Sequence, residues 1–264
     1  MNIFLRELKA NLKSLIIWCV IMILFVIIGA AKFSAYADNP EMLSILNAFP
    51  QAVLDALSLQ SFNLTTVSGF FGIMFVYFAL MGSIAAAMWG SGIISKEERD
   101  KTVEFSLVLP VSRSRVITAK ALAALVNCIA FALITWAASL MAAQSYTPDE
   151  AFYGFLRLEM EALFIIELIF LAIGLLLGCT MKQYKLSGST AVGVILITYF
   201  LSIVVTLDSK LDFLKYFTPF QYYDASQFFR TGHFELLYLL LSAAIIVLCV
   251  GVAYFTYNHR DLYI

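Results

Sequence analysis

Long apolar runs separated by short polar connections dominate the pattern of this chain. Six runs are long enough to cross the hydrocarbon core of a bilayer, which takes about 20 apolar residues in a helix. Their limits are residues 15–36, 68–94, 119–142, 158–180, 187–207 and 234–257. Because the apolar residues are continuous rather than alternating, and a helix satisfies its own backbone hydrogen bonds, the pattern predicts six transmembrane helices.

The composition agrees with this pattern. Hydrophobic residues make up 62% of the 264 residues and charged residues only 13%, whereas about 25% of the residues in soluble domains are charged. A soluble chain of this length could not bury so much apolar surface. The predicted fold class is therefore an all-α polytopic membrane protein, with residues 1–264 forming one domain in the lipid bilayer. The net charge of −1 gives no indication of a nucleic-acid partner.

The lysine and arginine residues predict the orientation. Of the 17, twelve lie on one side of the predicted membrane, four lie on the other side, and Lys32 lies near the end of the first run. The twelve are Arg6, Lys9, Lys13, Lys96, Arg99, Lys101, Arg113, Arg115, Lys120, Lys182, Lys185 and Arg260. The positive-inside rule places this side, with both termini, in the cytoplasm.

The first 14 residues, ahead of the first apolar run, mix apolar and basic side chains in an amphipathic pattern. Ile3, Phe4, Leu8 and Leu12 recur near the helical period, and basic side chains take several of the positions between them. This pattern predicts an amphipathic helix at residues 1–14 that lies on the cytoplasmic membrane surface. The alternative is that these residues simply extend the first transmembrane helix.

The connection between the second and third runs, residues 95–118, is a charged loop with an apolar middle. Ser95 fits a helix N-cap with Glu98 as its capping partner, and Ser112 fits the N-cap of the third helix. Between them we expect a short lateral helix that ends at or before Pro110. Its apolar side chains require cover, either from the headgroup region or from a protein partner.

This loop resembles a motif of the ABC-2-type permeases, which are membrane subunits of ATP-binding cassette transporters. The resemblance rests on the run KEERDKTVEF at residues 96–105, followed by LPVSRSR at residues 109–115. The family often has glycine before the threonine of the first run, where Lys101 stands here. Supporting matches, in the same order as in the family, are FLRELK at 4–9, AFP at 48–50 and FTPF at 217–220. The likeness covers nearly the whole chain.

The resemblance implies a six-span half-transporter that pairs with a second permease chain, identical or different, and with a cytoplasmic ABC ATPase subunit. ATP and magnesium would bind to that ATPase, so this chain would hold no cofactor or metal and catalyse no reaction. The sequence agrees, because it contains no G-x-x-x-x-G-K-[ST] phosphate-binding loop. Export by alternating access, across the cytoplasmic membrane of a bacterium, is the activity that the resemblance implies.

The resemblance also assigns roles to two cytoplasmic segments. Residues 1–14 would be a connecting helix, and residues 97–109 would contain a coupling helix that sits in a groove of the ATPase and transmits its movement to the permease. The implied coupling residues are Glu97, Glu98, Arg99, Thr102, Glu104, Phe105, Leu109, Pro110 and Arg113.

Glu167 is the ionisable residue that stands out within the predicted spans. A carboxyl group at that depth is costly and marks a candidate functional site. It would either contact a substrate or cation, or form a structural hydrogen bond to a neighbouring helix. Glu159 and Glu161 lie beside Arg157, and we expect them at the external interface.

Two pairs of small residues are spaced for close helix packing. Gly174 and Gly178 form a GxxxG pattern, and Ser189 and Gly193 form a related pair in the next run. We expect both to be packing seams within the chain, with a dimer contact as the alternative. The aromatic-rich connection at residues 208–233 either dips back into the membrane or lies at its surface.

Other chemistry is not indicated by the sequence. The four cysteines lie in different predicted spans and fit neither a disulfide framework nor a zinc site, and the two histidines lie on opposite sides of the membrane. Two other functions stay open. A secondary transporter independent of ATP would carry polar groups or helix breaks at mid-span in matching halves. A non-transporting anchor or sensor subunit would have the same topology.

Overall fold

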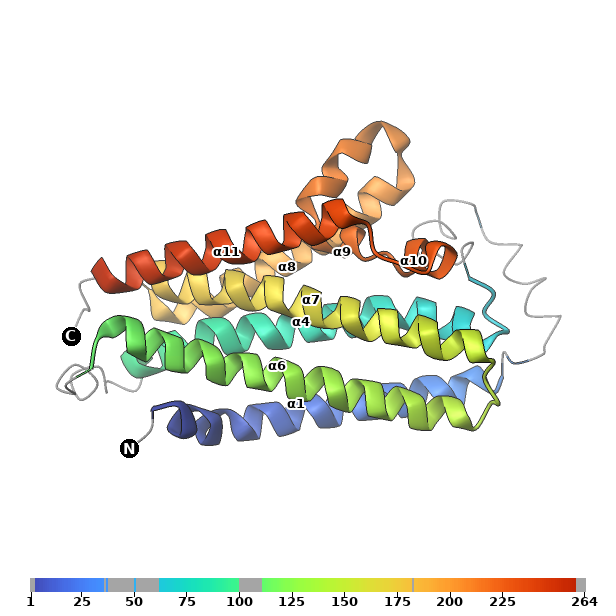
Figure 1. The fold of residues 1–264 in the computed structure, drawn as a ribbon, viewed down its shortest axis with the longest axis horizontal. Coiled ribbons are helices and arrows are strands. Elements are labelled where there is room, and N and C mark those ends of the chain that lie inside the picture. The colour runs from blue at the N-terminus through green and yellow to red at the C-terminus, as the bar shows by residue number, and fades with distance from the viewer. Residues whose placement is uncertain are drawn as a thin grey trace.

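The computed structural model describes residues 3–35, 37, 50, 62–99, 111–181 and 183–259. Its long helices are α1 (Ile3–Phe33), α4 (Val67–Arg99), α6 (Arg113–Gln144), α7 (Glu150–Thr180), α8 (Tyr184–Leu207) and α11 (Leu236–His259). Within the described part of the chain, these six helices are long and apolar enough to cross a membrane. They lie lengthwise in one bundle (Figure 1), which confirms the all-helical fold with six candidate spans.

Both termini of the helical bundle lie at the same end. The first residues of α1 and the last residues of α11 are found there, together with the end of α4 and the start of α6 (Figure 1). We call this the basic end, because most of the lysine and arginine residues belong to the segments that meet there. The arrangement fits an even number of spans, while the side of the membrane that the basic end faces stays a prediction.

The sequence predicts side-chain caps at Ser95 and Ser112, and the structure has one of them. Ser112 Oγ accepts a hydrogen bond from the Arg115 backbone N–H at 3.3 Å, so the predicted cap of the third span is confirmed. The predicted cap at Ser95 is wrong. Ser95 lies inside α4, and its hydroxyl donates to the Ser91 carbonyl at 2.9 Å. A serine satisfied by the preceding turn lets the helix continue past the apolar run.

The N-terminal arm is continuous with the first span rather than a separate helix. α1 runs without interruption from Ile3 to Phe33, as the alternative interpretation expects. Asn11 Nδ2 donates to the Glu7 carbonyl at 3.0 Å, and a side chain that bonds to the backbone one turn earlier is a known cause of helix bending. The arm is thus joined directly to the helix that it precedes in sequence.

A seam of glycines brings α4 and α7 into backbone contact. A Cβ added at Gly174 would lie 2.4 Å from the Ala87 carbonyl oxygen, and one at Gly178 would lie 2.9 Å from the Ser91 carbonyl oxygen. Gly90 of α4 contributes from the other side, because its Cβ would lie 2.5 Å from the Leu171 carbonyl oxygen. Side chains at these positions would hold the two helices apart.

The second pair of small residues does not form such a seam within the chain. Ser189 is exposed, with its hydroxyl bonded to the Leu186 carbonyl of its own helix at 3.0 Å. A Cβ at Gly193 would meet no atom of the described residues within 4 Å. The expected packing seam at Ser189 and Gly193 is therefore absent from the described part of this protomer, since this face of α8 is turned away from the bundle.

The connection between α8 and α11 dips back into the bundle. It contains the 3-10 helix η1 (Ser209–Phe217), α9 (Pro219–Tyr222) and α10 (Ala225–Thr231). The rings of Phe220 in α9 and Phe170 have centroids 5.4 Å apart, and Phe170 lies about 30 Å along α7 from its first residue. Phe228 in α10 returns to Phe155, with ring centroids 5.7 Å apart, close to the start of α7. We call residues 209–231 the re-entrant connection, because α9 and α10 pack back onto the bundle as the re-entrant alternative expects; their depth in a membrane stays a prediction.

Candidate functional site

The predicted coupling residues belong to the basic end, around the connection between α4 and α6. Glu97, Glu98 and Arg99 are the last residues of α4, and Arg113 is the first residue of α6. The other predicted coupling residues, which lie outside the described residues, are Thr102, Glu104, Phe105, Leu109 and Pro110. The structure therefore places the two helices that enter and leave this segment, and the coupling helix itself stays a prediction.

Arg113 joins α6 to the last turn of α11. Its Nη1 donates to the carbonyl oxygens of Tyr257 and Asn258 at 3.5 and 3.4 Å. A guanidinium at a helix C-terminus satisfies carbonyls that have no partner in the helix and favours the negative end of the helix dipole. One turn further along α6, the Thr118 hydroxyl is 2.8 Å from the Tyr254 hydroxyl. The start of α6 is thus attached to α11 by polar contacts on both turns.

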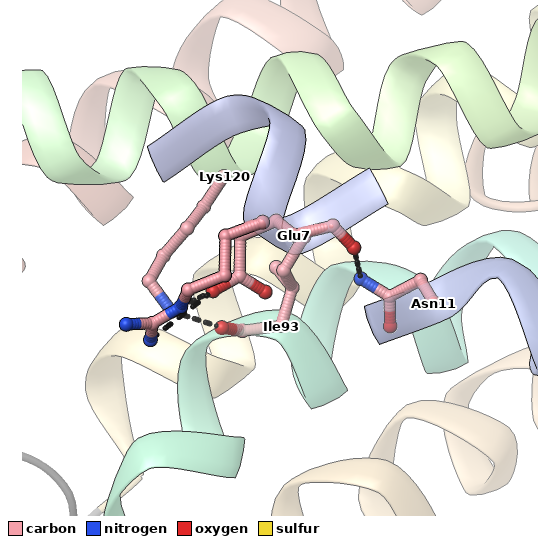
Figure 2. A network of polar contacts seen from close by, with 5 residues as sticks. Glu7, Asn11, Ile93 and Lys120 are labelled. Carbon is pink, nitrogen blue, oxygen red and sulfur yellow. Dashed lines mark hydrogen bonds and ion pairs between the residues drawn. The ribbon is translucent and has the colours of Figure 1, made fainter. Parts of the chain in front are cut away.

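A buried lysine connects three helices at the same end (Figure 2). Lys120 of α6 donates to the Ile93 carbonyl of α4 at 2.6 Å, and its Nζ lies 3.7 Å from Glu7 Oε1 of α1. The side chains of Lys120 and Glu7 are only 1% and 2% exposed. Arg6 Nη2 approaches the same carboxylate oxygen at 3.8 Å from the solvent side. We call Glu7, Ile93 and Lys120 the three-helix tie.

The three-helix tie couples the N-terminal arm to both helices that flank the predicted coupling segment. A second α1–α4 bond supports it, in which Trp89 Nε1 donates to Ser14 Oγ at 3.0 Å. Both charged groups of the pair are almost completely removed from water, so removing Lys120 takes a buried counter-charge from Glu7, which keeps only the half-exposed Arg6 at 3.8 Å among the ion pairs described for it. A displacement of the end of α4 or the start of α6 would therefore be passed to α1.

Two carboxyl groups of α7 are enclosed inside the bundle. Glu167 and Glu159 are both fully buried, and none of their carboxyl oxygens has a hydrogen-bond partner among the described residues. A Cβ added at Gly82 would lie 3.0 Å from Glu167 Oε1, so this carboxyl group packs directly against α4. Glu159 faces the bundle interior, whereas Glu161 is half exposed and pairs with Arg157 at 3.3 Å; the expected position of both at the external interface stays a prediction.

Comparison with known protein families decides what kind of membrane protein these features belong to. The model of the ABC-2 family transporter protein matches residues 1–262. This chain belongs to the ABC-2 transporter family. The match covers the arm, all six helices and the connection between α4 and α6, and it confirms the resemblance found in the sequence. A comparison with curated proteins gave no match.

Membership of this family explains why the permease consists of membrane helices without an ATPase domain. The membrane permeases of this family lack an ATPase domain and generally pair with separate ATPase subunits. The chain is accordingly a multi-pass membrane protein. In the described part of the permease no three His, Cys, Asp or Glu side chains are grouped as metal ligands would be.

A small cavity of about 60 Å³ lies where α4 and α8 meet the re-entrant connection, and Ser202, Gln221 and Asp224 are among its lining residues. Pockets for drug-sized ligands typically measure about 300–1,000 Å³. Neither Glu159 nor Glu167 lines this cavity. A single permease chain in this conformation thus offers no room for a large substrate there.

Replacing Glu167 with methionine separates the two roles considered for this residue. Methionine has a similar length and no polar atoms, so it removes a buried carboxyl group without hydrogen-bond partners among the described residues. We expect the variant to be about 1–3 kcal/mol more stable, seen as a higher midpoint of thermal unfolding in detergent. Ile166→Met, at the adjacent buried position, is the matched control. A lower midpoint for Glu167→Met than for this control would show that the carboxyl group forms a structural hydrogen bond.

Proposed function

We propose that this ABC-2 permease moves its substrate outward by alternating access, driven by an ATPase that docks on residues 97–113 at the basic end. The observation that supports this proposal is the three-helix tie. It fastens the helices on both sides of the predicted coupling segment, α4 and α6, to each other and to the N-terminal arm. A partner that pushes on this segment would act on three spans at once.

The packing inside the bundle offers a route for such a movement. α4 contacts α7 through the glycine seam, in which backbone atoms approach with no side chain between them. Closely packed helices shift as units because interiors are not compressible. Movement of α4 at the basic end would therefore displace α7, and with it the aromatic contacts between α7 and the re-entrant connection at Phe170 and Phe220.

The remaining parts of the proposal concern partners and orientation. The ATPase would bind ATP and magnesium, and two permease chains, identical or different, would each dock one ATPase subunit. The basic end would face the cytoplasm, because twelve of the 17 lysine and arginine residues belong to that side. Binding of ATP would then shift the population between inward-facing and outward-facing states of the permease pair.

Replacing Phe105 with alanine tests whether the ATPase docks as proposed. The permease is co-expressed with a candidate ABC ATPase, which we expect to be encoded in the neighbouring genes, and purified through a tag on the permease. We expect the amount of copurified ATPase to fall at least about tenfold, because a buried aromatic anchor at an interface contributes about 2 kcal/mol or more. Phe213→Ala, at an exposed phenylalanine of η1 away from the basic end, is the matched control and should retain the ATPase.

Two results would contradict this proposal. One is that no ATPase copurifies with the unaltered permease although the protein is folded. The other is that Phe105→Ala and Phe213→Ala retain the ATPase equally well, which would place the docking surface elsewhere. Substrate movement by the purified chain without ATP would instead support a secondary transporter.

A further inference from the structure

An apolar groove lies between α6 and α7, in the half of the bundle away from the basic end. It has a volume of about 240 Å³. Its walls include Ile129 and Leu133 from α6 and Met160 and Phe164 from α7. Along either helix the lining residues extend over seven steps, or about 10 Å at 1.5 Å per residue. The groove thus has the length and lining to hold part of one acyl chain.

Three amphipathic or charged side chains complete the same groove. Arg157 and Glu161 form an ion pair one helical turn apart, with Arg157 Nε 3.3 Å from Glu161 Oε1 and both side chains at least half exposed. Trp136 of α6 lines the groove as well, and tryptophan is enriched where a membrane meets water. The apolar groove is therefore bordered by one exposed ion pair and one interfacial side chain.

The depth of the ion pair matches the headgroup region of a bilayer. α7 has 31 residues and is about 46 Å long, about 16 Å longer than a hydrocarbon core of about 30 Å. A centred helix therefore projects about 8 Å at each end. Arg157 lies about 10 Å along α7 from Glu150, and helical side chains tilt toward the N-terminus, which is the outer end here. Arg157 therefore lies close to the boundary between acyl chains and headgroups, and Glu161, about 16 Å along α7 from Glu150, lies on the acyl-chain side of it and reaches toward it through the ion pair with Arg157.

We propose that this groove binds one zwitterionic phospholipid with a primary amine, of the phosphatidylethanolamine type. One acyl chain occupies the apolar groove, the phosphate binds Arg157, and the ammonium group binds Glu161. The contact to Glu161 uses Arg157 Nε, and a guanidinium has five N–H donors in a fork that suits phosphate oxygens. The binding site does not depend on the proposed ATP-driven export.

The charge balance of the groove favours this lipid over others. Arg157 alone would attract an anionic lipid, but Glu161 at 3.3 Å cancels its charge. A zwitterionic headgroup presents one charge of each sign and so complements the pair. Among zwitterionic lipids, a primary ammonium can donate hydrogen bonds to the Glu161 carboxylate, whereas a trimethylated ammonium has no N–H to donate.

Lipid titration of the full-length protein tests the assignment. The chain is purified in mild detergent, delipidated, and titrated with phosphatidylethanolamine, phosphatidylglycerol and phosphatidylcholine that carry the same acyl chains, and bound lipid is counted by native mass spectrometry. We expect one phosphatidylethanolamine to bind about fivefold more tightly than either other lipid, and Arg157→Gln to remove this advantage. Glu161→Gln should reverse the preference toward phosphatidylglycerol, a change that a merely structural ion pair would not produce.

Replacing each of two alanines of α6 with phenylalanine tests where the lipid binds. Ala132→Phe fills the groove that Ala132 lines, and Ala137→Phe makes the same change at an exposed α6 position outside the lining. We expect the first variant to lose the tight phosphatidylethanolamine and the second to keep it. The assignment is overturned if the unaltered protein binds the three lipids alike, if Glu161→Gln leaves the preference unchanged, or if the two alanine variants behave alike.

Discussion

Replacing Lys120 with methionine is expected to destabilise the protein by about 3–5 kcal/mol. The Lys120 ammonium donates to the Ile93 carbonyl at 2.6 Å and lies 3.7 Å from Glu7 Oε1. Methionine has a similar length, so it leaves little cavity, but it leaves the Glu7 carboxylate buried without this counter-charge. Glu7 Oε2 already has no hydrogen-bond partner in the described structure. The midpoint of thermal unfolding, followed by circular dichroism in detergent, measures the loss.

Two further variants show whether the loss comes from the ion pair. Lys9→Met changes an exposed lysine of the same arm and should leave the midpoint nearly unchanged. The double variant Glu7→Met, Lys120→Met removes both charges, and we expect it to recover most of the stability, because apolar pairs often replace buried ion pairs without cost. An unfolding midpoint for Lys120→Met equal to that of Lys9→Met would show that the three-helix tie contributes nothing.

If the double variant recovers the stability, the polar tie contributes a fixed helix register rather than free energy. Two methionines would fill the space without selecting one hydrogen-bond acceptor on α4 or one charge partner on α1. Lys120 instead fixes one backbone carbonyl of α4, and its charge selects one carboxylate of α1. Buried polar groups can specify one register among several in this way. Such a restraint suits helices that flank a segment on which a partner would act.

The sequence predicts the spans well because crossing a bilayer imposes a length and an apolar composition. The ends of the helices follow a different rule. α4 extends at least to Arg99 and α6 begins at Arg113, both beyond the apolar runs; α6 begins where the Ser112 side chain caps its backbone rather than where the lipid ends. The Ser112 cap was visible in the sequence for this reason.

Which charged side chains face the inside of the bundle was harder to predict from the sequence. For Glu159, the spacing of residues 157, 159 and 161 indicates the direction of the side chain. At 3.6 residues per turn, Arg157 and Glu161 share a face and Glu159 points away from it, so only Glu159 is turned into the bundle. Lys120 carries no such indication, because its partner Glu7 is on another helix, and only the arrangement of the bundle brings them together.

Replacing Gly174 with alanine is the second substitution for which we expect a large effect. The added methyl group would lie 2.4 Å from the Ala87 carbonyl oxygen and 2.9 Å from the Ala87 Cα. Both are backbone atoms, so no side chain can rotate away, and α4 and α7 must separate. Overpacking of this kind costs about 1–3 kcal/mol. The result should appear as a lower unfolding midpoint, although alanine is the better helix former.

Gly193→Ala is the matched control for this substitution, because it adds the same methyl group to a transmembrane glycine with no described atom within 4 Å of its Cβ position. The control should unfold at the same midpoint as the unaltered protein or slightly higher, since alanine favours a helix by up to about 1 kcal/mol. Gly90 faces Gly174 across the seam, and a Cβ added there would lie 2.5 Å from the Leu171 carbonyl oxygen. Gly90→Ala should therefore lower the unfolding midpoint as Gly174→Ala does. If Gly174→Ala and Gly193→Ala unfold alike, α4 and α7 do not meet through their backbones, and the proposed transmission of movement from α4 to α7 loses its physical basis.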